Sequence, residues 1–79
     1  MAKILLVEDN EMNRDMLSRR LERFGYLVST AASGPEALDV LSTQAVSTVL
    51  LDSQMPGMGG LEVLQILRRS WSASELPVL

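Results

Sequence analysis

Apolar and polar positions follow two different spacings along the first 25 residues. Ile4–Val7 is a continuous apolar run that ends in Glu8-Asp9-Asn10, which is typical of a strand covered on both faces. Apolar residues then recur at helical spacing, at Met16, Leu17, Leu21 and Phe24. This spacing predicts a helix of about 13 residues that begins after an Asn10 cap and ends before Gly25.

The same alternation continues through the rest of the chain. Leu27–Ala31 is predicted as a strand, and Ser33 with Glu36 has the capping-box spacing of a second helix, with Pro35 in its first turn. Val46–Leu51 is predicted as a third strand that ends on Asp52. The remaining segments are interpreted as a loop over 55–60, a third helix over 61–69, a polar link over 70–75 and the start of a fourth strand over 76–79.

The order of these elements is βαβαβα followed by the start of a fourth strand. Alternating strands and helices with short connections predict an α/β fold with a parallel sheet and right-handed crossovers. The sequence contains no internal repeat and no candidate linker, so residues 1–79 are interpreted as one domain.

Composition narrows the function. The chain has 79 residues, 47% of them apolar and 22% charged, with a net charge of −3. It contains no cysteine and no histidine, which excludes disulfides, thiolate zinc sites and histidine catalysis, so that a bound metal has to be a hard cation held by oxygens. No basic stripe suggests nucleic-acid binding, and no apolar run is long enough for a membrane span. A cytoplasmic location is expected.

Carboxylates follow two of the predicted strands. The first strand ends on Glu8-Asp9 and the third on Asp52. A single aspartate at a strand end is usually a turn former, and Glu8-Asp9-Asn10 alone is compatible with helix capping. If the two strands are neighbours, however, three carboxylates meet at one sheet edge, where their repulsion favours a cation such as Mg²⁺.

Several stretches together resemble the receiver domain of bacterial two-component response regulators, of the chemotaxis-response-regulator type. Residues 3–10 resemble its first strand and acidic pair, and Phe24-Gly25-Tyr26 its entry to the second strand. Residues 31–38 have its A-x-x-G-x-E-A-L pattern, and Leu50-Leu51-Asp52 with Met55-Pro56 its phosphorylation-site signature. Residues 9–14 are similar to receivers of hybrid sensor kinases and phosphorelays.

The resemblance implies a flavodoxin-like sheet with strand order 2-1-3(-4). It implies that Asp52 accepts a phosphoryl group from a sensor histidine kinase or a histidine phosphotransfer protein, so that any phosphotransfer is onto the chain itself and the chain is no enzyme. It also implies a Mg²⁺ site, with Asp9, Asp52 and the backbone carbonyl of Gln54 as direct ligands and Glu8 often acting through a water.

The resemblance also implies that the domain is truncated. The chain is expected to stop inside the fourth strand, after roughly two thirds of a receiver. The family's switch Ser or Thr and its lysine would lie beyond Leu79, and the one lysine present is Lys3. Impaired phosphorylation and a homodimer joined through an exposed sheet edge are therefore expected. The alternatives are a phosphorylation-incompetent receiver that acts as a self-associating interaction module and an engineered half-domain.

Overall fold

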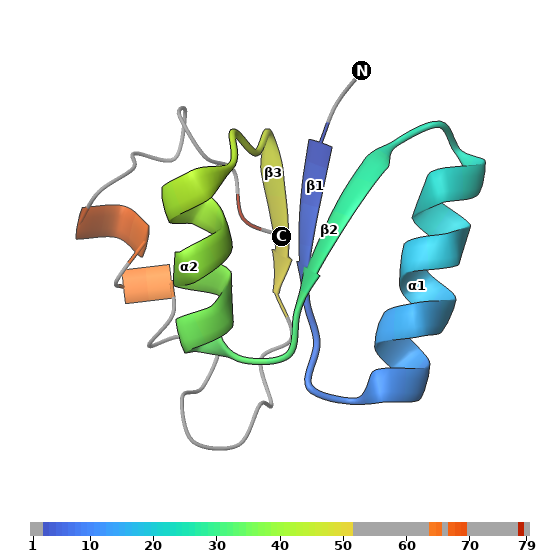
Figure 1. Ribbon diagram of the computed structural model, residues 1–79, viewed down its shortest axis with the longest axis horizontal. Coiled ribbons are helices and arrows are strands. Elements are labelled where there is room, and N and C mark those ends of the chain that lie inside the picture. Colours follow the sequence, from blue (N-terminus) through green and yellow to red (C-terminus); the bar gives the residue numbers. More distant parts are fainter. Residues whose placement is uncertain (1–2, 52–63, 66, 70–77, 79) are drawn as a thin grey trace.

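Three parallel strands form the centre of the molecule, with helices on both sides (Figure 1). The computed structural model describes residues 3–51, 64–65, 67–69 and 78. The elements in chain order are β1 (Lys3–Val7), α1 (Glu11–Arg23), β2 (Leu27–Ala31), α2 (Gly34–Thr43) and β3 (Thr48–Leu51). Residues 64–65 and 67–69 are helical, as the sequence predicts, and the rest of the predicted third helix lies outside the described residues.

The strand order is β2-β1-β3, which confirms the order predicted from the sequence. β1 pairs with β2 from Lys3 opposite Leu27 to Val7 opposite Ala31. On its other side β1 pairs with β3, where Val7 lies opposite Leu51. Val78 adds an isolated parallel bridge to Val49, on the side of β3 away from β1. This bridge lies where the predicted fourth strand belongs.

Both ends of α1 are closed by local hydrogen bonds. The side chain of Asn10 accepts a bond from the backbone N–H of Asn13 at 2.9 Å, as expected of an N-cap. After the last turn, the N–H groups of Gly25 and Tyr26 donate to the carbonyls of Glu22 and Leu21, which is the Schellman pattern. Gly25 has φ of 92° there, in the left-handed region that only glycine adopts without strain.

The start of α2 follows the predicted capping box with one difference. The Ser33 hydroxyl accepts a bond from the N–H of Glu36 at 3.3 Å, and Pro35 lies in the first turn. The Glu36 carboxylate, however, accepts from the N–H of Ala32 rather than from that of Ser33 itself. The bond from Ala32 ties the end of β2 to the helix, so the connection between the two elements is short and held at both ends.

β3 is shorter than predicted, because it begins at Thr48 rather than at Val46. The N–H of Ser47 still donates to the carbonyl of Lys3 at 2.8 Å. Lys3 is the first residue of β1, so Val46 has no described strand residue opposite it. Val46 packs against the core from the loop after α2. Because it is apolar and directly precedes the strand, the sequence pattern extends the strand to it.

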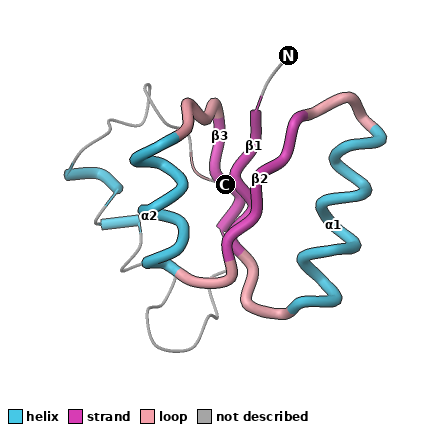
Figure 2. The backbone as a smooth tube through the Cα atoms, in the orientation of Figure 1, coloured by secondary structure: helices cyan, strands magenta, loops and turns pink. Residues whose placement is uncertain are grey.

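The two faces of the sheet are covered differently (Figure 2). Alternate strand residues face α2, and together with α2 and the helical residue Leu67 they form one buried cluster: Leu5, Val7, Ala31, Ala37, Leu41, Val49 and Leu67. Ile4 and Leu6 point to the opposite face, on the side of α1, and are also buried. Yet α1 itself has no buried residue. Neither α1 nor α2 is long and apolar enough to cross a membrane.

Candidate functional site

The carboxyl end of β1 carries two of the predicted site residues. Asp9 is exposed, and Glu8 is half-buried. One carboxylate oxygen of Glu8 accepts a bond from the N–H of Asn10 at 3.1 Å. The Glu8 side chain therefore supports the start of α1, in line with the capping interpretation. A carboxylate has several lone pairs, so this bond is compatible with a further role in binding a metal ion.

Arg14 closes the turn between β1 and α1. It lies in the first turns of α1, and its guanidinium donates a hydrogen bond to the backbone carbonyl of Glu8 at 3.0 Å. The spacing of residues along the helix does not by itself predict this contact. The available signal is that side chains lean toward the N-terminus of their helix, so that a long cation one turn after the cap reaches back to the end of the preceding strand.

The register of β1 and β3 supports a site at this edge. Val7 and Leu51 are paired, and in the sequence they directly precede Glu8 and Asp52. Asp52 and Gln54 themselves lie outside the described residues. The predicted meeting of Glu8, Asp9 and Asp52 therefore stays a prediction.

The donor chemistry at this edge suits a hard cation. Within the described ranges, no three acidic, histidine or cysteine side chains come together as a metal site. The two described candidates, Glu8 and Asp9, both offer carboxylate oxygens, which Mg²⁺ prefers, and this ion commonly takes only one or two carboxylates and keeps waters. The described residues therefore offer oxygen ligands of the kind that a magnesium site needs, and the predicted ligands Asp52 and Gln54 lie outside the described residues.

The sequence matches the response regulator receiver domain over residues 4–79. It is 38% identical over 79 residues to the transcriptional regulatory protein AfsQ1 of Streptomyces coelicolor, a match that spans all of this chain and 34% of that protein. The chain spans about a third of the length of the curated relatives it matches.

Solved structures agree with this match. The chemotaxis response regulator CheY4 of Vibrio cholerae is 36% identical, with a TM-score of 0.90 over 99% of this chain and 65% of that one. TrrA of Thermotoga maritima, crystallised with Mg²⁺ and BeF, is 35% identical, with a TM-score of 0.89 over 99% of this chain and 66% of that one. TrrA has also been crystallised with the histidine kinase ThkA, and in that structure it matches with a TM-score of 0.88.

Proposed function

The chain belongs to the response regulator receiver family, and we propose that it is a phosphoacceptor in a two-component His-Asp phosphorelay, phosphorylated on Asp52. The observation that carries the proposal is the pairing of Val7 with Leu51. In each strand the next residue along the chain is an acid of the predicted site. A parallel sheet gathers such residues at its carboxyl edge, where ligands of this fold class bind.

The reaction we propose is a direct displacement at phosphorus. A carboxylate oxygen of Asp52 forms a bond to the phosphorus of a phosphohistidine on the partner protein. The P–N bond breaks, and its electron pair returns to the imidazole of the donor. The product is an acyl phosphate on Asp52 and a free histidine on the donor.

The other residues of the edge bind and orient. We propose that Asp9, Asp52 and the carbonyl of Gln54 hold Mg²⁺ directly and that Glu8 acts through a water. When bound there, Mg²⁺ offsets the negative charge that builds on the phosphoryl oxygens. Arg14 positions this edge, because its bond to the Glu8 carbonyl ties the end of β1 to α1. The magnesium complex of TrrA supports the same ion for a related chain.

The partner we propose is a sensor histidine kinase or a histidine phosphotransfer protein. The crystallised complex of TrrA with the histidine kinase ThkA supports this class of partner. The cytoplasmic location expected from the sequence stays a prediction.

The rate of phosphorylation should be low in the 79-residue chain. Its one lysine, Lys3, begins β1, whereas Glu8 follows the opposite end of that strand. At about 3.3 Å per residue, the strand separates these two backbone positions by roughly 16 Å. Because Lys3 lies this far from Glu8, we expect its ammonium to give the phosphoryl group no charge in addition to that of Mg²⁺, and the rate to be about 10²–10³-fold below that of a receiver with a lysine beside the metal site.

A time course with acetyl phosphate and Mg²⁺, followed by intact mass, tests the proposal. We expect slow gain of one phosphoryl group, no gain in Asp52→Asn, and unchanged gain in Asp39→Asn, whose exposed carboxylate lies on α2. A gain that survives Asp52→Asn would assign phosphorylation to another residue. Calorimetry with Mg²⁺ adds a readout that does not depend on turnover, and we expect the heat to decrease in both Asp9→Asn and Asp52→Asn.

A specific observation favours a second function, that of a self-associating interaction module. Among the described residues, five large apolar side chains are exposed, all of them on α1 or on the residues that follow it: Met12, Met16, Phe24, Tyr26 and Leu27. Exposed apolar side chains of this size can be covered when two copies of the chain associate. The dimer contact that we propose is the sheet edge at β3, because this outer strand has only the isolated bridge from Val49 to Val78 as further pairing among the described residues.

Sedimentation equilibrium distinguishes this second function from the first. A monomer has a mass of 8.7 kDa, and we expect a larger species at tens of micromolar. Wild-type and Asp52→Asn chains should associate equally if association is independent of phosphorylation. A single monomeric species throughout would exclude the interaction module.

A further inference from the structure

The free edge of the sheet at β2 has backbone groups that no described residue uses. The carbonyl of Ala31 accepts a bond from the N–H of Glu8 at 3.0 Å, so Ala31 faces β1. Because alternate residues of a strand bond to opposite sides, Leu27 and Ser29 also face β1. The N–H and C=O groups of Val28 and Thr30 therefore point outward. The described residues provide no partner for them.

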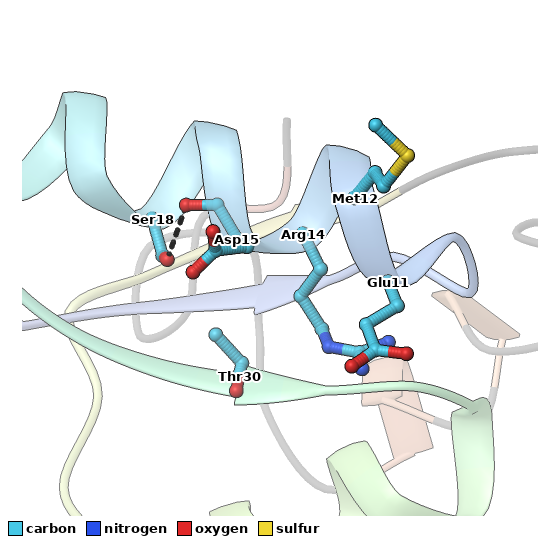
Figure 3. A pocket seen from close by; sticks show the side chains of 6 residues that line it. All are labelled: Glu11, Met12, Arg14, Asp15, Ser18 and Thr30. Atoms are coloured by element: carbon cyan, nitrogen blue, oxygen red, sulfur yellow. Dashed lines mark hydrogen bonds between the residues drawn. The ribbon is translucent and has the colours of Figure 1, made fainter.

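This edge is flanked by a hollow on either side. A cavity of about 370 Å³ lies between α1 and β2, and Figure 3 shows Thr30 facing Arg14, Asp15 and Ser18 across it. A second cavity of about 400 Å³ lies between the end of β2 and α2. Thr30 and Arg14 line both. The two hollows therefore border one another at Thr30, and we call them together the β2 groove.

The β2 groove is acidic on both sides of the strand. α1 contributes Glu11 and Asp15, and α2 contributes Glu36 and Asp39. Among the described residues that line it, Arg14 is the one cation, so their carboxylates are in excess by three. Arg14 already donates to the carbonyl of Glu8. Asp15 also pairs with Arg19 at 3.3 Å, but both side chains are more than half exposed, and such a pair neutralises little of the field.

We propose that the β2 groove is a docking site for a short, extended, basic peptide segment of a partner protein, which adds to β2 as an outer strand. The outward groups of Val28 and Thr30 would provide the main-chain hydrogen bonds, as in other cases of strand addition. Successive side chains of the added strand would point alternately to α1 and to α2. Since carboxylates lie on both sides, the segment should carry adjacent basic residues, one for each side.

A second copy of this chain is a poor occupant of the same edge. Pairing β2 with β2 of another copy would bring two identical sets of carboxylates together, and like charges at that range repel. The charge of the β2 groove therefore selects a partner of opposite sign and protects this edge from self-pairing, as edge charges do in other sheets.

The test is an NMR titration of the labelled 79-residue chain with a seven-residue peptide that has Lys-Arg-Lys-Arg at its centre. We expect the amide signals of Val28 and Thr30 to shift and their hydrogen exchange to slow. A peptide with Glu at the four basic positions should leave them unchanged. A basic peptide that is N-methylated at alternate residues keeps its charge but loses donors on one edge, and it should bind about two- to tenfold more weakly.

Charge reversal on the protein provides the matched comparison. Asp39→Lys should weaken binding of the basic peptide by about two- to fivefold. Glu22→Lys makes the same change at an exposed residue of α1 that does not line the β2 groove, and it should have a smaller effect. The proposal is overturned if the shifts fall outside Val28–Thr30, if N-methylation has no effect, or if the two reversals weaken binding equally. None of these outcomes depends on Asp52.

Discussion

The two faces of the sheet share the same three strands but are packed to different degrees. On one face α2 buries Ala37 and Leu41 in one cluster with residues of the strands. On the other face α1 is longer, yet none of its residues is buried, and Met12 is 83% exposed. Since buried apolar area is the main source of stability, the α2 face should supply most of the folding free energy. The α1 face is left with apolar surface that is available to other molecules.

The largest expected change in the free energy of unfolding comes from truncating a buried side chain on the α2 face, compared with the same kind of truncation on α1. Leu5→Ala removes a fully buried side chain from the cluster with α2, and it should lower the free energy of unfolding by about 2–5 kcal/mol. Met12→Ala on α1 should change it by less than about 0.5 kcal/mol. Urea denaturation measures both. Similar losses for the two variants would show that α1 is packed as tightly as α2.

Substitution of Gly25 should have the next largest effect on the free energy of unfolding. Because α1 has no buried residue, its stability depends on the hydrogen bonds that close its two ends. The φ of 92° at Gly25 is unfavourable for other residues, although a Cβ there would meet no atom within 4 Å. Gly25→Ala should therefore cost about 1–2 kcal/mol from backbone strain alone. Gly25→Asn should cost less, since asparagine tolerates this region better. If both variants were as stable as the wild type, the turn after α1 would have to rearrange freely.

The two N-caps test how far α1 and α2 each depend on local hydrogen bonds. Asn10→Ala and Ser33→Ala each remove a bond to a backbone N–H and should each cost about 1 kcal/mol. The two variants should differ in the amide hydrogen exchange of the helix that each cap begins. Loss of Asn10 should expose α1 to exchange along much of its length, whereas α2 should stay protected by its buried residues. Equal protection of the two helices in the two variants would contradict this contrast.

The smallest effect on stability is expected at the exposed end of α1. Phe24 is 76% exposed, so Phe24→Gln should change the free energy of unfolding by less than about 0.5 kcal/mol. The same variant should weaken self-association, if the apolar surface of α1 contributes to it. Sedimentation equilibrium measures the association, with Glu22→Gln on the same helix as the control. A large loss of stability instead would show that Phe24 is buried in solution.

The functional edge could be predicted in part from the sequence. Glu8 and Asp9 follow β1 as expected, and the pairing of Val7 with Leu51 agrees with the predicted neighbours. The contact between Arg14 and the Glu8 carbonyl was not predicted, because the position of Arg14 one turn after the cap makes the contact possible, but the turn between β1 and α1 decides whether it forms. The positions of Asp52 and Gln54 lie outside the described residues, so their part of the site stays a prediction.

Local chemistry in the sequence determined the elements and their ends. Several features could be predicted because each depends on neighbours within a few residues. They are the bounds of β2, the caps at Asn10 and Ser33, and the glycine after α1. Only the tertiary structure decided which apolar residues are buried. Val46 packs from a loop rather than from a strand, and Met12 on α1 and Phe24 just after it are exposed. Burial depends on what packs against a residue from elsewhere in the chain, and this cannot be read from its own spacing.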